Sequence, residues 1–241
     1  MVNPNNPTGA IYSESDVKKV VDIAAENDLP ILSDEIYSMI TFDGFVHRSL
    51  PLIAGDVPVI VVSGMSKVFM RTGWRIGYVC FHDPKGKISE ARKAVGRYSR
   101  LYGHGRSCIP SHTLAAATKA YEGFPEGTEP AAAVRQLVPE LQMRRDFLDR
   151  RYEEIGGIDC VKTMGALYTF PKIRAIPGTW KIEVEFLADL IKEEGIEIGP
   201  PGSNFGKSGF GHFRQLLLPK KEILVDSTNR LERFLKRHSA V

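Results

Sequence analysis

The chain has 241 residues, of which 43% are hydrophobic and 25% are charged, a composition typical of a globular protein with a substantial core. Its formal charge of +3 is small, and its basic residues are interspersed with acidic ones, which does not favour nucleic acid as a partner. No apolar run is long enough to span a membrane, no secretion signal is visible, and the three cysteines lack metal-ligand spacing. We therefore expect a cytoplasmic enzyme or binding domain without a metal site.

The first third of the sequence predicts strands that alternate with a helix. A turn rich in Asn and Pro at residues 3–9 precedes a helix that begins at Ser13, because the apolar residues between positions 17 and 25 fall on one helical face. Three short apolar runs predict strands, at 29–32, 57–62 and 76–81. The densest of these runs is expected to be buried on both faces. This order is typical of a parallel or mixed sheet flanked by helices, an α/β fold.

The middle of the chain predicts helices, at 83–102, 111–121 and 131–155, with a loop at 123–130. The last helix should bend near Pro139 and is long enough to connect two domains. Beyond it the predicted elements are short and mixed. The expected strands are 158–161, 166–170, 196–198 and 213–218, and the expected helices are 184–194 and 221–238. We therefore expect two domains, residues 1–155 and a small α+β domain of residues 156–241.

Polar side chains follow the ends of two predicted strands. Asp34 and Tyr37 follow the first strand, and Lys67 follows the second in a turn of small residues. An isolated loop lysine is usually a solvated surface residue. Here, however, the carboxyl ends of parallel strands meet at one edge of a sheet, where such sheets bind ligands, and Asn6 in the opening turn could join them. A lysine, a carboxylate and a phenol, with Arg75 as a phosphate ligand, suit an aldehyde cofactor that contains a pyridine ring.

Four motifs carry a resemblance to a known family, and they are NPNNPTG at 3–9, SDEIY at 33–37, Ser66-Lys67 and GWRIG at 73–77. Each motif alone is common, but their order and spacing together are specific. The chain resembles the class I/II aminotransferases of the fold-type I pyridoxal-phosphate family over essentially its whole length. The resemblance implies that residues 1–155 are the C-terminal part of the cofactor-binding large domain, with a mixed, mostly parallel sheet.

The resemblance also implies roles for the residues of the site. Lys67 resembles the lysine that forms a Schiff base with pyridoxal 5'-phosphate and carries the proton, and Asp34 resembles the aspartate that pairs with the pyridine nitrogen. Asn6 and Tyr37 resemble the pair that hydrogen-bonds the phenolic oxygen of the ring, which favours its ionised form. Ser66 and Arg75 resemble phosphate ligands, Arg214 resembles the arginine that grips the substrate carboxylate, and Gly165 resembles a glycine near the substrate.

Within the family, the runs GALYTFPKI at 165–173 and GHFRQLLLP at 211–219 most resemble prokaryotic alanine aminotransferases. This implies transfer of an amino group between alanine and 2-oxoglutarate, in a homodimer. Gly64 departs from the commonest family pattern, which has a serine there as a phosphate donor. A carbon–sulfur β-lyase on the same fold and a non-catalytic module that binds pyridoxal phosphate are the alternatives.

The resemblance covers only the C-terminal part of the family's chain. Family members carry a long segment before the Asn-Pro-Thr-Gly motif that supplies the first strands, a phosphate loop and an aromatic ring over the cofactor. The sequence begins directly at that motif. We therefore expect a truncated gene product, a fragment or a mis-called start. An inactive fragment that depends on a separately supplied N-terminal piece is one of the alternatives.

Overall fold

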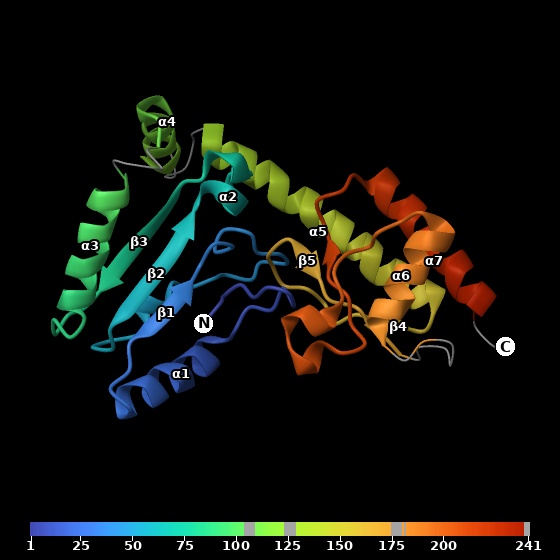
Figure 1. Ribbon diagram of the computed structural model, residues 1–241, viewed down its shortest axis with the longest axis horizontal. Helices are drawn as coiled ribbons and strands as arrows, with labels where there is room; N and C mark the ends of the chain where they lie inside the picture. Colours follow the sequence, from blue (N-terminus) through green and yellow to red (C-terminus); the bar gives the residue numbers. More distant parts are fainter. Residues whose placement is uncertain (104–108, 123–128, 175–179, 181, 239–241) are drawn as a thin grey trace. The chain divides into compact units, whose positions relative to one another are not determined.

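The computed structural model describes residues 1–103, 109–122, 129–174, 180 and 182–238 (Figure 1). The chain forms two compact units. Unit 1 comprises residues 1–4 and 11–137, and unit 2 comprises residues 5–10 and 138–241. The opening turn is thus divided between the units. The domain boundary predicted near residue 156 stays a prediction.

Unit 1 is built on a three-stranded sheet with the order β1-β2-β3 (Figure 1). The strands are β1 (Ile31–Asp34), β2 (Val59–Gly64) and β3 (Gly77–His82). β1 pairs with β2 in parallel, and β2 pairs with β3 in an antiparallel ladder, so the sheet is mixed and the predicted α/β class is confirmed. β3 is an edge strand in the part of the chain that the structure describes.

One face of this sheet is covered by α1 (Glu14–Glu26) and the short 3-10 helix η1 (Leu50–Leu52). The helix begins where the sequence predicted, because Ser13 Oγ accepts a hydrogen bond from the N–H of Asp16 at 3.2 Å. The buried apolar side chains of this core are Val17, Val21, Ala24, Ile31, Leu50, Ala54, Val57, Val59 and Val61. On the other face, Ile60 and Val62 are only half-buried, so the expectation that this strand is buried on both faces was wrong.

The rest of unit 1 is mainly helical. After β2 come α2 (Met65–Val68) and the 3-10 helix η2 (Thr72–Trp74), and after β3 come α3 (Ser89–Gly103) and α4 (Ser111–Glu122). α4 contributes Ala117 to a small core with Met65 and Ile76. The long helix α5 (Glu129–Ile155) contains the passage from unit 1 to unit 2. The predicted loop at 123–130 lies largely outside the described residues.

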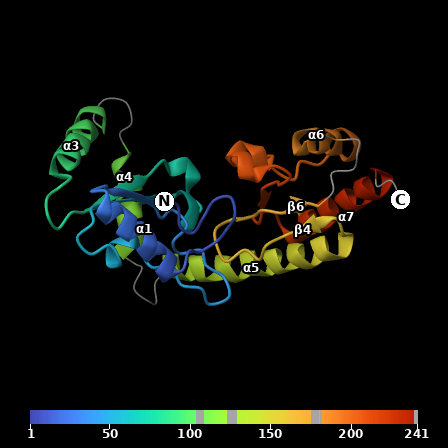
Figure 2. The ribbon, with the colours of Figure 1, turned by 90° about the horizontal axis from the view of Figure 1, so that it is seen from below.

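Unit 2 combines short antiparallel strand pairs with helices (Figure 2). The strand pairs are β4 (Ile158–Asp159) with β6 (Lys172–Ile173) and β5 (Tyr168–Thr169) with β7 (Gln215–Leu216). The helices are α6 (Glu183–Glu194) and α7 (Lys221–His238), with 3-10 turns η3 (Gly202–Phe205) and η4 (Lys207–Gly209) between them. Trp180, Phe186 and Phe234 form an aromatic cluster between α6 and α7, with ring centroids 5.2–5.4 Å apart.

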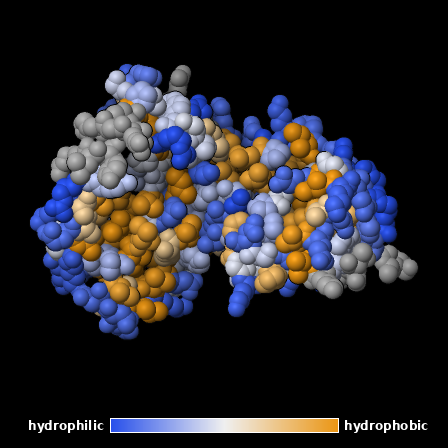
Figure 3. Space-filling model, in the orientation of Figure 1, coloured by the Kyte–Doolittle hydropathy of each residue, from blue (hydrophilic) through white to orange (hydrophobic). Residues whose placement is uncertain are grey.

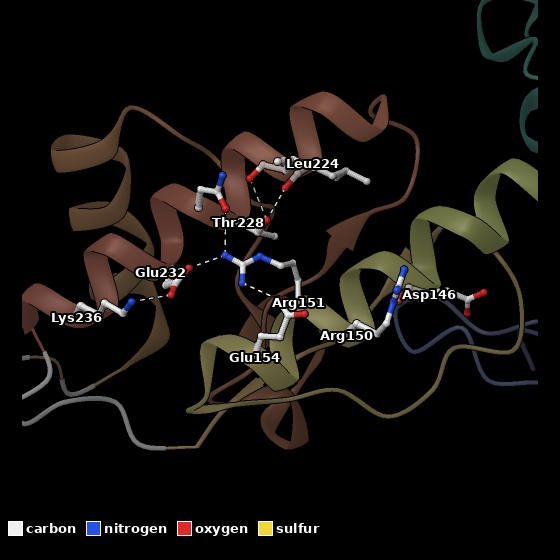
Figure 4. A network of polar contacts seen from close by, with 10 residues as sticks. Asp146, Arg150, Arg151, Glu154, Leu224, Thr228, Glu232 and Lys236 are labelled. Carbon is white, nitrogen blue, oxygen red and sulfur yellow. Dashed lines mark hydrogen bonds and ion pairs between the residues drawn. The ribbon is translucent and has the colours of Figure 1, made fainter.

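A polar network joins the C-terminal end of α5 to α7 (Figure 4). Arg151 donates to Asn229 Oδ1 at 3.0 Å, to Glu232 Oε2 at 2.5 Å and to Glu154 Oε2 at 2.9 Å. Hydrogen bonds from Lys236 and Arg151 lower the pKa of the Glu232 carboxyl to about 2. This network fixes the two helices against each other within unit 2.

The strand predicted at 196–198 was wrong, since these residues have no regular structure. Gly195 ends α6 in the left-handed region at φ +66°, and the backbone of Gly199 approaches Arg214 so closely that a Cβ atom would lie 1.9 Å from the Arg214 carbonyl oxygen. Ile198 is buried without a ladder partner among the described strands. The apolar run at 196–198 therefore indicates a buried segment and not a strand. The short strand β6 was not predicted.

No helix in the described part of the chain has the length and apolar character that crossing a membrane requires.

Candidate functional site

The strand-end residues of unit 1 lie on two parallel neighbours. Asp34 is the last residue of β1, and its register partner is Val62 of β2. Its backbone is held by the first residues of the chain, since its N–H donates to Met1 O at 2.8 Å and its carbonyl accepts from Asn3 N at 3.1 Å. Its carboxylate is half-buried, and Oδ1 accepts from the N–H of Ile36 at 3.1 Å. The other carboxylate oxygen has no hydrogen-bond partner within the described residues.

Lys67 lies just beyond β2, which ends at Gly64, where the backbones of β2 and β3 approach each other closely. A Cβ atom on Gly64 would lie 2.6 Å from the carbonyl oxygen of Ile76, which also accepts from the N–H of Met65 at 3.1 Å. The chain then turns into α2, which places Lys67 five residues beyond the register partner of Asp34. Lys67 is half-buried, and its amine makes no hydrogen bond or ion pair with any residue that the structure describes. Within the described part of the chain, the amine is therefore available to react with an aldehyde.

The two predicted phosphate ligands flank this lysine along the chain. Ser66 is half-buried, and its carbonyl accepts from Thr72 Oγ1 at 3.1 Å. Arg75 adopts a left-handed conformation at φ +55° and is exposed, and Nη1 donates to Thr72 O at 3.3 Å. Since the described residues give Arg75 this one weak bond, most of its guanidinium donors are available for an anion.

Tyr37 is buried and belongs to a short turn at residues 36–39. The N–H of Ser38 donates to Glu35 O at 3.0 Å, and the N–H of Ile40 donates to Tyr37 O at 2.8 Å. Glu35 and His47, which sequence reasoning did not select, form a buried pair beside this turn, with Oε2 and Nε2 3.2 Å apart. No local pattern indicated this pair, because the two residues are brought together by the intervening loop.

The remaining predicted residues belong to unit 2. The turn after Asn5 is closed by hydrogen bonds from Gly9 N to Asn5 O at 2.9 Å and from Thr8 Oγ1 to Asn5 Oδ1 at 2.8 Å. The carbonyl of Gly9 accepts from the N–H groups of Met164 and Gly165 at 3.0 and 2.9 Å. Gly9 has φ +67°, and a Cβ atom on it would lie 2.8 Å from Gly165 O. The opening turn is therefore fixed to the segment that leads into β5.

Arg214 is the polar centre of this part of unit 2. Nη1 donates to Asn6 Oδ1 at 2.9 Å, and the guanidinium lies 4.2 Å from the ring centre of Tyr168 and 5.0 Å from that of Phe205. Its Nε atom is buried and has no partner among the described residues. The aromatic rings hold the charge in place, and the unpaired nitrogen fits a further anionic acceptor such as a carboxylate. Tyr168 and Phe205 were not selected from the sequence as neighbours of this arginine.

The structure thus brings the predicted residues together in two groups. Asp34, Tyr37, Ser66, Lys67 and Arg75 lie in unit 1, and Asn6, Gly165 and Arg214 lie in unit 2. The first group has the chemistry to hold an aldehyde cofactor that carries a ring nitrogen and a phosphate, and the second can bind a carboxylate. Among the described residues, no group of three or more His, Cys, Asp or Glu side chains could hold a metal ion.

Comparisons with known proteins agree with this chemistry. A family model described as "Aminotransferase class I and II" matches residues 1–215. A glutamate-pyruvate aminotransferase from Haemophilus influenzae is 32% identical over 98% of the chain, and the match covers 56% of that protein. An aromatic-amino-acid aminotransferase from Thermococcus litoralis is also 32% identical, over 99% of the chain and 57% of that protein. The chain therefore spans about half the length of the curated relatives it matches.

Solved structures give the same result. The alanine aminotransferase from Pyrococcus furiosus superposes with a TM-score of 0.89 at 40% sequence identity. The superposition covers 98% of this chain and 57% of that one. An aromatic aminotransferase from Pyrococcus horikoshii, at 31% identity, superposes with a TM-score of 0.82 over the whole chain and 60% of its own length.

Proposed function

The chain belongs to the class I and II aminotransferases, and from this membership we propose that it serves the pyridoxal-phosphate-dependent transfer of an amino group between an L-amino acid and a 2-oxo acid. Bound pyridoxal 5'-phosphate supplies an electron sink that stabilises negative charge at the substrate Cα. A cytoplasmic location stays a prediction from the composition, and a homodimer stays a prediction from the family resemblance.

Unit 1 carries the residues that would hold the cofactor. Lys67 is proposed as the covalent anchor and the proton carrier, since its amine has no partner among the described residues. Asp34 is proposed as the partner of the ring nitrogen, since one of its carboxylate oxygens likewise has no partner in the described part of the chain. Ser66 and Arg75 would bind the phosphate, and Tyr37 would donate to the phenolic oxygen. The observation that carries the proposal is the pairing of β1 and β2 in parallel, because it brings the ends that lead into Asp34 and Lys67 to the same edge of the sheet.

Unit 2 carries the residues proposed to recognise the substrate. Arg214 would bind the α-carboxylate, since its Nε has no partner in the described chain and aromatic rings fix its guanidinium. Asn6 is proposed as a cofactor ligand, and Gly165 to admit the substrate close to the backbone. Alanine and 2-oxoglutarate are proposed as the substrates, because several relatives are named alanine or glutamate-pyruvate aminotransferases.

The test is incubation of the chain with pyridoxal phosphate, alanine and 2-oxoglutarate. We expect pyruvate and glutamate to form in equal amounts, and Lys67→Ala to abolish their formation because the covalent anchor and proton carrier is lost. Lys85→Ala, which removes an exposed lysine paired with Asp56, is the matched control and should retain activity. Release of ammonia and pyruvate from cystathionine, without glutamate formation, would instead identify a carbon–sulfur β-lyase.

A second arm of this test is needed because the chain covers only about half the length of its relatives. If the chain alone is inactive, the portion of the Pyrococcus furiosus enzyme outside the match is added as a separate polypeptide. Restored turnover would show that this chain is one part of an aminotransferase. A cofactor absorption band without turnover in either arm would favour a non-catalytic module that binds pyridoxal phosphate. Absence of the band in the wild type, as in Lys67→Ala, would contradict cofactor binding by this chain.

A further inference from the structure

Glu35 is a buried carboxylate at the end of β1 whose contacts are all within unit 1. The residue is 4% exposed. Oε1 accepts from Ser33 Oγ at 3.0 Å and from the N–H of Leu50 at 2.9 Å, and Oε2 lies 3.2 Å from Nε2 of His47, which is also buried. Ser33 and Asp34 of β1 point to opposite faces of the strand, and the carboxylate of Glu35 contacts Ser33, so it lies on the side opposite Asp34. Any effect of Glu35 on a ligand beside Asp34 therefore passes through the backbone.

The backbone of Glu35 is tied as firmly as its side chain. Its N–H donates to Val62 O of β2 at 3.0 Å, and its carbonyl accepts from the N–H of Ser38 at 3.0 Å and from Ser63 Oγ at 3.5 Å. The first contact fixes the end of β1 to the strand that leads to Lys67. The second closes the turn that contains Tyr37. One residue thus links three segments, which are the end of β1, the end of β2 and residues 47–50.

The buried contacts of Glu35 favour its charged form. Burial by itself disfavours the charged carboxylate, but hydrogen bonds from His47, from the N–H of Leu50 and from Ser49 outweigh this effect and hold the pKa of Glu35 below its usual range. A buried carboxylate with several donors is costly to remove, because each donor that stays buried then lacks a partner.

We propose that Glu35 is a positioning residue for the cofactor site: its buried contacts with Ser33, His47 and Leu50 fix the backbone on which Asp34 and Tyr37 stand. The inference rests on the proposed function for the roles of Asp34 and Tyr37, and it adds a residue that does not touch the cofactor. Asp34 precedes Glu35 directly and Oδ1 accepts from the N–H of Ile36, so the Asp34 side chain depends on the backbone on both sides of Glu35.

The structure offers a conservative variant and a matched control. In Glu35→Gln the amide oxygen can still accept from Ser33 and Leu50. Its NH₂ group can donate to His47 Nε2 once the imidazole proton moves to Nδ1, an atom that is buried without a partner among the described residues. The control is Glu14→Ala, because Glu14 pairs with Arg48 and so holds the same 47–50 segment from the exposed side of unit 1.

The first measurement is amide hydrogen exchange of residues 36–50 in the cofactor-free chain. We expect Glu35→Ala to accelerate exchange at Ser38, Ile40 and Leu50 by about ten- to hundredfold, since buried hydrogen bonds are lost. Glu35→Gln and Glu14→Ala should stay within about threefold of the wild type. If Glu35→Ala does not fold, His47→Ala replaces it and should accelerate exchange by about tenfold.

The second measurement uses pyridoxal 5'-phosphate. Glu35→Ala should weaken its binding by about tenfold or more. It should also raise the pH at which the visible band of the bound cofactor titrates, because Tyr37 no longer stabilises the ionised phenolic oxygen. Glu35→Gln should restore both the affinity for the cofactor and the pH at which its band titrates. A residue that only stabilises the fold, far from the site, would affect neither quantity. Exchange and cofactor binding in Glu35→Ala that match Glu14→Ala would overturn the positioning role. If the wild type shows no cofactor band, the proposed function fails, and the exchange result alone decides whether Glu35 fixes the Asp34–Tyr37 segment.

Discussion

Arg214 holds its charge in an environment that favours a planar anion. Its guanidinium lies over the ring of Tyr168 and beside that of Phe205, donates to Asn6, and keeps a buried Nε without a partner in the described chain. The aromatic faces attract the cation and restrict its rotation. The proposed role in carboxylate binding therefore depends on the planar shape of the Arg214 guanidinium as well as on its charge.

We predict that Arg214→Lys raises the apparent KM for alanine by about ten- to hundredfold, since a lysine keeps the charge but loses the paired hydrogen bonds. The maximal rate should change less, because Arg214 is proposed to bind the substrate and not to move its proton. Steady-state kinetics check this. Arg174→Lys, in an exposed pair with Asp159 of the same unit, should leave KM unchanged. An unaltered KM in Arg214→Lys would contradict the assignment.

Asp149 is a half-buried carboxylate with few hydrogen-bond partners among the described residues. It lies on α5, 3.7 Å from Nε of Arg145, and its Oδ1 has no partner among the described residues. Burial raises the pKa of Asp149 to about 6, although Arg145 opposes this shift. The folded chain then retains a proton that the unfolded chain releases near pH 4. The free energy of unfolding should therefore fall as the pH rises from about 4 to 6 and level off above that range.

We predict that Asp149→Asn removes this decrease and raises the free energy of unfolding at pH 7 by up to about 2 kcal/mol. Arg145 keeps its bond to Asp146 at 2.7 Å, so its charge stays paired. Urea unfolding at several pH values between 4 and 8 measures the effect. Asp146→Asn, at a more exposed carboxylate beside the same arginine, should keep the decrease. Persistence of the decrease in Asp149→Asn would assign it to another group.

At the scale of elements, the close approach of β2 and β3 at Gly64 explains why this position is a glycine and not the serine of the commonest family pattern. The extended backbone at this residue would suit any side chain, but a Cβ atom would lie 2.6 Å from Ile76 O and 2.9 Å from Gly77 Cα. The two strands are in register at Gly64 and Gly77, so neither backbone can move without disturbing the ladder. Glycine is therefore required by close packing at the point where the chain turns toward Lys67.

We predict that Gly64→Ser lowers the free energy of unfolding by about 1–3 kcal/mol, the usual effect of overpacking. The added hydroxyl should not strengthen phosphate binding, since the strand end must shift to admit it. Gly73→Ser is the matched control, because open space surrounds the Cβ position of Gly73. Thermal unfolding and cofactor titration of both variants check the prediction. A Gly64→Ser protein that is stable and binds pyridoxal phosphate more tightly would contradict it.

At the scale of the whole molecule, the sequence predicted the order of elements more completely than their partners. β-Branched runs and the cap at Ser13 located β1, β2, β3 and α1, because these signals are local. The pair of Glu35 and His47 and the rings around Arg214 were not predicted, because they depend on how distant segments return to one another. The apolar run at 196–198 failed for the same reason, since its burial comes from contacts outside any ladder. Motif order did predict the family, which the comparisons confirm.

The exposed face of the sheet is a property of unit 1 that only the assembled strands show. Leu32, Ile60 and Phe81 are aligned in register across β1, β2 and β3, and Val62 and Val79 form the next row on the same face, beside Asp34 of β1. Leu32 is 56% exposed and Val79 36% exposed, and the other three are half-buried. Figure 3 shows hydrophobic side chains gathered over this part of the molecule. Contiguous apolar surface of this kind is uncommon on a soluble monomer and favours association.

We predict that the 241-residue chain associates in a concentration-dependent manner through this face. Added sulfate should strengthen the association, because kosmotropic salts disfavour exposed apolar surface. The double variant Leu32→Lys and Val79→Lys should reduce association at least about tenfold, since two charges would have to be buried. Analytical ultracentrifugation over a range of concentrations measures this. Val161→Lys, at an 84% exposed valine of unit 2, is the control and should associate as the wild type does. Equal association of all three proteins would assign the contact to another surface.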